Sequence, residues 1–457
     1  MQSLIPENHW KYIFFAFAIN IFLRGILFFA VFPEDHVLRL DDQGEYLSLA
    51  EAIEKTGFDE NFKVGRTPTY PLFLYICSHI SKSLFFPIIV QHGIGLGAIF
   101  FVYLSGFLFS EKIALFSLFL GALNFNFIVL SNYLLSDSLY YPMFCVLYFF
   151  ILRFYLLGST VTNSVALGVV LGFSILIRPV SMYMPFFIIP FIIWTNRKMF
   201  RKGIIHSLIF LFSVSIILCP WFYRNYKVYH AFGLTNFGYY QLMTGIIPGV
   251  MMGVQNISFR EAQEKAWAGW EKEKTKIPME IQKNPFEIDS IGKEYALKTL
   301  WSYPITNLLF AWGWGAARNL FSPEIIEISH LTNWEWSRFA DTKGSNYLEK
   351  SWNFIFSNKN SWYSALFCFG CFVVILLRIV QTIGATVWMK QDPVMVIFLL
   401  VNIVYFLLLM GPYGSPKYRL PFEPILIIFG AFGIQKLFLK DYKASENNEK
   451  FLSGSRS

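Results

Sequence analysis

Long apolar runs recur from one end of this chain to the other, and they restrict its fold more than any other feature of the sequence. A run of about 20 apolar residues can cross the roughly 30 Å hydrocarbon core of a membrane as a helix. Only 15% of the 457 residues are charged, against about a quarter in a soluble domain. A membrane β-barrel would show short alternating segments instead. The sequence therefore predicts an all-α polytopic membrane protein.

We expect about ten transmembrane helices. The segment 303–321 is apolar enough to be an eleventh, but an odd count would put the basic C-terminal tail and the basic loop near residue 200 on opposite sides. We therefore expect 303–321 to lie in the membrane interface, together with the seven tryptophans from Trp301 to Trp362. The ten expected spans are 12–32, 84–109, 113–131, 138–157, 162–178, 182–195, 203–220, 361–382, 393–411 and 421–438.

Basic residues indicate the orientation. Four of them crowd into the short loop 197–202, and five more lie at or after the end of the last span. Short basic loops stay on the cytoplasmic side, so ten spans place both termini in the cytoplasm and the loop 33–83 outside. The part of this loop from 33 to 70 holds nine acidic and four basic residues, which agrees with an outside location.

These spans divide the chain into four parts. Residues 1–220 are expected to form a transmembrane catalytic module that includes the extracytoplasmic loop 33–83. Residues 221–360 are expected to form an extracytoplasmic domain with interfacial, juxtamembrane helices. Residues 361–438 supply the last spans, and the polar tail 439–457 is expected to be disordered in the cytoplasm.

Several classes of function are excluded by the sequence. The net charge of +8 is spread over loops and forms no basic stripe, which argues against a nucleic-acid partner. Cys368 and Cys371 have CxxC spacing inside an apolar run, where we interpret them as small apolar residues of a helix. The sequence contains no HExxH, Walker, GxSxG or dinucleotide fingerprint.

The first outward loop carries the strongest candidate for chemistry. Residues 43–56 predict an amphipathic helix, with Asp41 or Asp42 as its N-cap and Tyr46 one turn later. Capping is the structural interpretation of these acids. The functional interpretation is that Asp42, partly shielded from water, acts as a general base on a substrate. The two roles are compatible.

Cations at the outer ends of spans form a second candidate group. Arg66 opens an Arg-Thr-Pro-Thr-Tyr-Pro element, and its planar guanidinium suits phosphate binding, although it could also snorkel. Asp137 starts the fourth span as an N-cap or as a functional acid. Outward cations oppose the positive-inside tendency, so an anionic ligand should balance them. The other cations of this group are Arg178, Arg224, Lys417 and Arg419.

Seven short motifs follow one another in the segments expected to face outward. They are Asp42-x-x-x-Tyr46, Arg66-Thr-Pro-Thr-Tyr70-Pro, Leu135-Ser-Asp137, Ile177-Arg178-Pro179, Pro220-Trp-Phe-Tyr-Arg224-Asn225, Thr235-Asn236-Phe-Gly-Tyr239 and Tyr418-Arg419-Leu-Pro421. Their order and shared side resemble the GT-C fold membrane glycosyltransferases. The closest resemblance is to the glycosyltransferase family 39-like group, which includes protein O-mannosyltransferases and aminoarabinose transferases. The resemblance covers most of residues 1–245 and 411–424, and the rest of the large outer domain carries no motif of this group, so the acceptor stays open.

This resemblance implies an inverting glycosyltransferase that uses a sugar on polyprenyl phosphate. Asp42 would be the catalytic base, with Asp137 as a second catalytic candidate. Arg66, Arg178, Arg224, Lys417 and Arg419 would bind the donor phosphate. A divalent cation, Mg²⁺ or Mn²⁺, could lie near Asp42 and Asp137, but two distant carboxylates make a poor metal site, and we expect none. The substrate pocket would include Asp41, Tyr46, Tyr70, Asn225, Asn236 and Tyr418.

Two alternatives remain open beside this hypothesis. One is a surface-polysaccharide polymerase or ligase that uses a lipid-diphosphate glycan. The other is a transporter or flippase for a lipid-linked solute, although the inverted repeats and broken helices of transporters are not evident. For the transferase, the sugar is a hexose or a pentose, and the acceptor is a glycan, a glycolipid or a protein hydroxyl. We expect a multi-pass protein of the bacterial plasma membrane with its site outside the cytoplasm.

Overall fold

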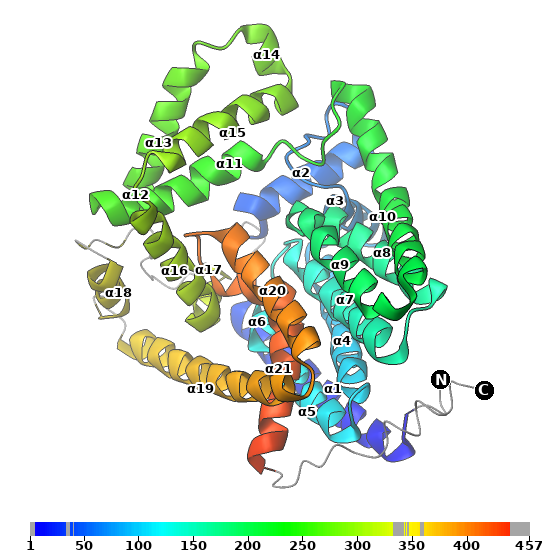
Figure 1. Ribbon diagram of the computed structural model, residues 1–457. Helices are drawn as coiled ribbons and strands as arrows, with labels where there is room; N and C mark the ends of the chain where they lie inside the picture. The colour runs from blue at the N-terminus through cyan, green and yellow to red at the C-terminus, as the bar shows by residue number, and fades with distance from the viewer. Residues whose placement is uncertain are drawn as a thin grey trace.

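The computed structural model describes residues 5–32, 37–39, 41–331, 342, 344, 347–356 and 361–438. Within these ranges every regular element is a helix (Figure 1), which confirms the predicted all-α class. The tail 439–457 lies outside the described residues, so the prediction of disorder there is not addressed.

The N-terminal half forms most of a helical bundle. Short 3-10 turns lie at η1 (Val37–Arg39), η2 (Pro179–Tyr183) and η3 (Arg197–Met199). The helices are α1 (Glu7–Val31), α2 (Asp41–Thr56), α3 (Thr69–Ile80), α4 (Phe85–Phe107), α5 (Glu111–Ala122), α6 (Phe125–Leu130), α7 (Asp137–Leu157), α8 (Val161–Ile177), α9 (Pro185–Thr195) and α10 (Phe200–Tyr229).

The remaining elements form an outer domain and three more bundle helices. The outer domain holds α11 (Gly238–Gln241), the π-helical turn η4 (Leu242–Ile246), α12 (Ile247–Gln255), α13 (Phe259–Lys274), α14 (Met279–Lys283), α15 (Pro285–Trp301), α16 (Ile305–Phe321), α17 (Ile325–Leu331) and α18 (Tyr347–Phe356). The bundle is completed by α19 (Ser361–Gln391), α20 (Pro393–Met410), the turn η6 (Pro416–Phe422) and α21 (Glu423–Phe438).

Seven of the described helices are long and apolar enough to cross a membrane, or eight if the bent pair formed by 238–255 and 259–274 counts as one span. Expected spans 162–178 and 182–195 correspond to shorter apolar helices, α8 and η2 with α9. The expected span 113–131 is not one helix: it breaks after Ala122, and Asn124 caps a new helix by accepting a hydrogen bond from Phe127 N at 3.1 Å. The prediction that this span forms a single helix was therefore wrong.

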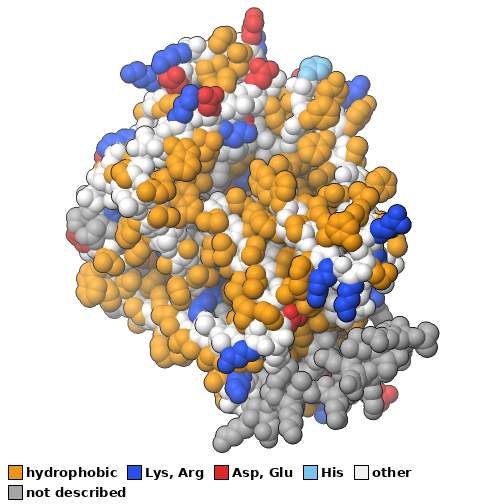
Figure 2. Space-filling view, viewed as in Figure 1, with side chains coloured by type: hydrophobic (Ala, Val, Ile, Leu, Met, Phe, Trp, Pro, Cys, Tyr) orange, Lys and Arg blue, Asp and Glu red, His pale blue; other side chains and the backbone are white. Residues whose placement is uncertain are grey.

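The helix ends that carry the sequence motifs meet at one end of the bundle. Four hydrogen bonds join them: Tyr46 to Ser136, Arg178 to Asp137, Arg224 to the carbonyl of Phe62, and Asn126 to the carbonyl of Pro416. Figure 2 shows hydrophobic side chains over the middle of the molecule, with acidic and basic ones mixed over α13 and α14. At the opposite end the charged side chains are mostly Lys and Arg. This pattern is that of a multi-pass membrane protein.

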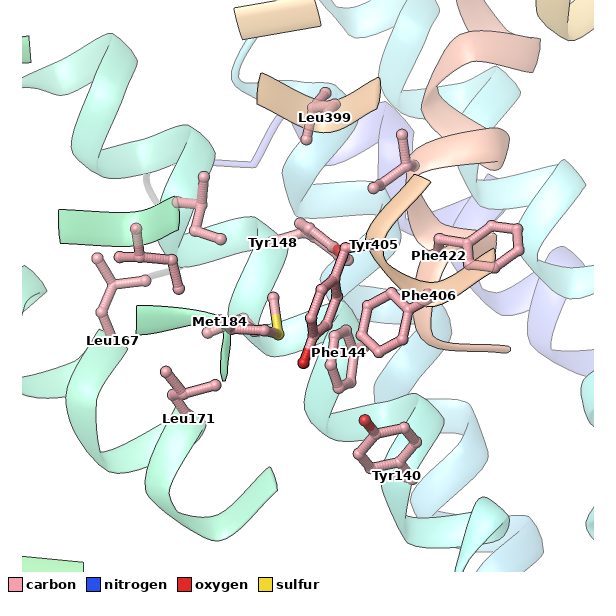
Figure 3. Packing of buried hydrophobic residues seen from close by; sticks show 14 of the residues in the cluster. Tyr140, Phe144, Tyr148, Leu167, Leu171, Met184, Leu399, Tyr405, Phe406 and Phe422 are labelled. Carbon is pink, nitrogen blue, oxygen red and sulfur yellow. The ribbon is translucent and has the colours of Figure 1, made fainter. Parts of the chain in front are cut away.

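Aromatic packing fills the centre of the bundle. In Figure 3, Phe144 from α7 lies against Tyr405 and Phe406 from α20, and the rings of Phe144 and Phe406 meet edge to face at 5.4 Å. Such edge-to-face pairs add about 0.5–1.5 kcal/mol beyond the area they bury. This core holds α7, whose first residue is Asp137, in a fixed position relative to the turn that follows α20.

The outer domain begins later than the sequence predicted. The boundary expected between residues 220 and 221 falls inside α10, which continues through Pro220 to Tyr229. Beyond it, α12, α13 and α15 bury a small core around Trp270. The segment 303–321 forms α16, a 17-residue helix outside the group of candidate spans. Trp301, at the end of α15, is 69% exposed, as expected for a residue at the membrane interface.

Candidate active site

Arg66 binds two carboxylates of α2 at the outer end of the bundle. Its Nη2 donates to Asp42 Oδ1 at 2.6 Å, and its Nε donates to Glu45 Oε2 at 2.9 Å. Asp42 and Glu45 are three residues apart on α2, so they share one face of that helix. The Arg66 side chain is 14% exposed and that of Asp42 is 46% exposed. Asp42 can therefore contact a ligand while it is held by Arg66.

The predicted helix around Tyr46 forms, but it begins at Asp41, so neither Asp41 nor Asp42 is the N-cap that we expected. It runs from Asp41 to Thr56, and Gly57 ends it with a left-handed φ of 73°, a conformation that favours glycine. Asp42 lies in the first turn, one residue inside the start of the helix. The side chain of Asp41, predicted for the substrate pocket, lies outside what the structure describes.

Charge keeps Asp42 ionised. Burial alone would raise the pKa of its carboxyl, but the positive charges of Arg66, Lys417 and Arg178 outweigh burial. The pKa of Asp42 therefore lies below its ordinary value. These same three cations were predicted to bind a phosphate; Arg66 contacts Asp42 directly at 2.6 Å, and the charges of Lys417 and Arg178 also act on this carboxylate.

Asp137 and Arg178 form an ion pair beside this group. Arg178 Nη1 donates to Asp137 Oδ1 at 2.5 Å, with the acid 1% and the arginine 22% exposed. A carboxylate that is buried and occupied in this way orients its partner cation. The geometry therefore favours Arg178 as a ligand-binding residue and gives Asp137 a positioning role, which differs from the catalytic role that we expected for it.

The turn η6 brings Lys417 and Tyr418 to the same place. The Lys417 ammonium lies 5.2 Å from the centre of the Tyr418 ring. Within the described part of the chain, no carboxylate lies within salt-bridge distance of Lys417. Its neighbour Arg419 is 1% exposed and is bound by Glu423 and Glu324. Lys417 is thus available to an anion, whereas Arg419 holds the turn in place, contrary to its predicted role.

Arg224 and Asn225 both make hydrogen bonds to backbone carbonyls. Arg224 donates to the backbone carbonyls of Phe58, Asp59 and Phe62 in the loop after α2. Asn225 is fully buried and accepts from Arg224 Nη1 at 2.8 Å. Arg224 therefore ties the end of α10 to the loop that precedes Arg66, whereas Asn225 donates to the carbonyl of Gly233 in the segment after α10. We expected Arg224 to bind the donor phosphate and Asn225 to line the substrate pocket. Neither residue lines the cavity beside Asp42.

Two of the three tyrosines predicted for the pocket, Tyr46 and Tyr70, are buried beneath Arg66 or near it. Tyr46 and Tyr70 are buried and meet edge to face at 4.8 Å. Tyr46 donates to Ser136 at 2.9 Å, and Tyr70 donates to Gln91 at 2.6 Å. The guanidinium of Arg66 lies 5.2 Å from the centre of the Tyr46 ring. Tyr46 therefore underlies Arg66, while Tyr70 is a packing residue.

A cavity of about 620 Å³ opens beside Asp42. Its lining includes Asp42, Glu45, Lys63, Arg66, Asn236 and Tyr240, so the prediction for Asn236 agrees with the geometry. Among the described residues, the lining does not include Arg178 or Lys417. Asp42 thus borders the cavity, and the charges of Arg178 and Lys417, which do not line it, also act on this carboxylate.

Sequence reasoning missed Glu45 and the aromatic residues of the cavity. Glu45 could have been found from its spacing, because it follows Asp42 by one helical turn. Phe237, whose ring lies 4.5 Å from the Arg66 guanidinium, lies within the motif 235–239, but its partner is 171 residues earlier in the chain, and the motif alone does not indicate this contact.

A resident metal has no evident ligand set in the described residues, where no three or more His, Cys, Asp and Glu side chains come together. The two nearest carboxylates, Asp42 and Glu45, both bind Arg66. We therefore derive no chemical step through a metal.

Comparison with known proteins supports the fold and part of the sequence. Residues 66–223 match the family model of dolichyl-phosphate-mannose-protein mannosyltransferases. The chain is also similar to the solved structure of an oligosaccharyltransferase from Archaeoglobus fulgidus tethered to an acceptor peptide, with 14% identity and a TM-score of 0.54. That alignment covers 96% of this chain and 51% of the other. A comparison with curated proteins finds no significant match.

A second structure of the archaeal enzyme AglB, in complex with an inhibitory peptide and a dolichol-phosphate, gives 12% identity and a TM-score of 0.51 over 97% of this chain and 53% of that one. The chain thus spans about half the length of the oligosaccharyltransferase chains that it matches. ArnT from Cupriavidus metallidurans bound to undecaprenyl phosphate matches more weakly. Its TM-score is 0.38, with 13% identity over 94% of this chain and 78% of that one. The family-model match and the fold confirm the resemblance to GT-C fold membrane glycosyltransferases.

Proposed function

We propose that this chain is an inverting glycosyltransferase that moves a sugar from a polyprenyl phosphate to an acceptor hydroxyl. One observation carries the proposal: Asp42, a carboxylate held by Arg66 at 2.6 Å, borders a ligand-sized cavity, and the positive charges of Arg178 and Lys417 also act on it. The match of residues 66–223 to a family that uses a lipid-phosphate sugar supports the donor class.

The donor phosphate would bind between Arg66, Arg178 and Lys417. Lys417 has its ammonium available, and Asp137 orients Arg178. Arg66 can turn its guanidinium from Asp42 to the phosphate while Glu45 still holds it. This exchange matters because a carboxylate that is hydrogen-bonded to a guanidinium is a weak base. Donor binding would free Asp42 for proton transfer at the moment when it is needed.

In the reaction, Asp42 takes the proton from the acceptor hydroxyl as the hydroxyl oxygen forms a bond to the anomeric carbon. The bond from that carbon to the phosphate oxygen breaks, and its electron pair stays on the polyprenyl phosphate. The three cations stabilise the charge that develops there. Attack from the face opposite the phosphate inverts the anomeric configuration. A phosphate leaves readily, so no general acid is needed.

Asp42→Asn tests this assignment. The amide keeps the size of the side chain but cannot accept the proton, so transfer should fall by roughly 10²–10⁴-fold. The measurement is release of polyprenyl phosphate, together with sugar incorporation, from a labelled polyprenyl-phosphate sugar by the purified protein. Unchanged thermal unfolding shows that the variant is folded. Glu54→Gln, which removes a half-exposed carboxylate from the same helix, should leave transfer intact.

Wild-type transfer by Asp42→Asn would refute the assignment. A wild-type protein that accepts only lipid-diphosphate glycans would favour the polymerase or ligase alternative. Translocation of the labelled lipid without release of polyprenyl phosphate would favour a flippase.

We also infer that the site lies outside the cytoplasm of a bacterium, in its plasma membrane. The basic loop 197–202 at the other end of the bundle supports this orientation through the positive-inside tendency. Lipid-phosphate donors are the activated sugars suited to a compartment without nucleotide sugars.

A further inference from the structure

The cavity beside Asp42 is lined in part by aromatic residues, whereas Arg178 and Lys417 are not part of its lining. Four aromatic residues line it, Tyr229, Phe237, Tyr239 and Tyr240. Only Val64 and Pro285 supply aliphatic surface. An acyl chain or an aliphatic side chain would require more of that kind of surface. The cavity therefore suits a ligand that is flat, apolar on its faces and polar at its edges.

The aromatic surface is held rigidly in place. The backbone N–H of Tyr239 donates to Asp289 Oδ1 at 2.8 Å, and Asp289 is 2% exposed and paired with Lys293. Gly292 on α15 leaves room for the ring, since a Cβ there would lie 2.6 Å from Tyr239 Cγ. The segment that carries the rings is thus fixed on α15 before any ligand binds, which lowers the entropic cost of binding.

Tyr240 offers the most open ring of this surface. It is 41% exposed, its ring lies 4.7 Å from that of Phe237, and Trp267 supports it at 5.5 Å. Phe237 in turn packs on the Arg66 guanidinium. The aromatic surface therefore leads from the open cavity directly to the side chain that holds Asp42.

Polar groups lie around this surface. Asn236 and Glu45 reach the cavity near Gly65, and the exposed Lys63 stands at its rim. Sugar rings carry weakly positive C–H groups on their faces, which pack on the electron-rich faces of aromatic rings. Their edge hydroxyls both donate and accept hydrogen bonds, as an amide, a carboxylate and an ammonium require.

We propose that the acceptor is a glycan, and that its terminal sugar stacks on Tyr240 and Phe237 with a free hydroxyl directed at Asp42. This inference rests on the proposed function and adds the acceptor class to it. The sugar that receives the transfer lies in the cavity, while the phosphate of the donor lies on the side of Arg178 and Lys417.

The inference can be tested by binding, without any transfer reaction. Purified protein in lipid nanodiscs, free of glycoside detergents, is titrated with a panel of methyl hexosides and methyl pentosides and with a Ser/Thr-containing peptide. Saturation-transfer NMR should show contact of the protein with the ring C–H protons of at least one glycoside. Tyr240→Ala should weaken that signal roughly tenfold, and Tyr240→Phe should retain most of it. Tyr223→Ala, which removes a 59% exposed ring from α10 outside the cavity, is the matched control.

Binding of the peptide but of no glycoside would overturn the inference in favour of a protein acceptor. A glycoside signal that is the same in Tyr240→Ala and the wild type would overturn the assigned surface. Failure of the proposed function gives a different result. If glycoside binding depends on Tyr240 but no polyprenyl phosphate is released, the glycan site is supported and the transferase activity is rejected. In active protein, Tyr240→Ala should raise the KM for a glycan acceptor and leave the KM for the donor unchanged.

Discussion

At the scale of single residues, the arginines of this chain show why residue type alone does not identify a binding site. Arg66, Arg178, Arg224 and Arg419 all lie at helix ends on one side of the bundle. Arg224 binds three backbone carbonyls and Arg419 binds two acids, so both stabilise loops. Arg66 and Arg178 bind carboxylates at the edge of open space. The partners of a guanidinium, which lie far apart in the sequence, determine its role.

The pH dependence of transfer should report the charges around Asp42. The pKa of Asp42 is lowered in the folded protein, so the base is ionised at neutral pH and transfer should fall only as the pH drops through that lowered value. Lys417→Gln removes one of the positive charges that lower it. The pKa should then rise, and the acidic limb of kcat/KM should move to higher pH. Lys436→Gln, at the far end of α21, should leave the limb in place. An acidic limb that stays fixed or moves to lower pH in Lys417→Gln would contradict the charge assignment.

At the scale of elements, local sequence signals predict the helices well and their exact lengths less well. The amphipathic pattern of 43–56 and the glycine at 57 predict α2 and its end, because both signals act within one or two turns. The break between α5 and α6 depends on a short polar cap inside an apolar run, and hydropathy alone does not register it. The continuation of α10 past Pro220 depends on packing by Trp221 and Asn225, which are buried against the outer loop.

Two glycines set the distance between α19 and α21. A Cβ on Gly384 would overlap the carbonyl oxygen of Phe429, and one on Gly433 would overlap that of Val380. Small residues at such crossings allow close packing in membranes. Gly384→Ala should therefore destabilise the protein, by about 1–3 kcal/mol for overpacking, and lower the midpoint of thermal unfolding in detergent. Gly313→Ala on α16, where a Cβ meets nothing within 4 Å, should be neutral or stabilising by about 0.5–1 kcal/mol. Equal midpoints for the two variants would contradict the close approach.

At the scale of the whole molecule, the sequence predicts which segments share a side of the membrane. The motifs around Asp42, Asp137 and Arg178 lie far apart in the chain, yet the alternation of spans brings them to one end. The cavity was not predictable in this way, because the motif 235–239 beside Tyr240 does not indicate which elements this segment packs against. Its position relative to α2 depends on tertiary packing of α11 on α15, for which neither periodicity nor composition gives a signal.

The side of the membrane on which the site lies can be tested by chemical labelling. If the loop 197–202 is cytoplasmic, the outer domain and the cavity face the opposite compartment. Lys272→Cys on α13 and Lys198→Cys in the basic loop place exposed thiols at the two ends of the molecule. A membrane-impermeant maleimide should label Lys272→Cys in intact bacterial cells, and Lys198→Cys only after permeabilisation, with the unsubstituted protein as the baseline for the five native cysteines. The reverse pattern would put the Asp42 carboxylate in the cytoplasm, where nucleotide sugars are present and the argument for a lipid-linked donor loses its physical basis.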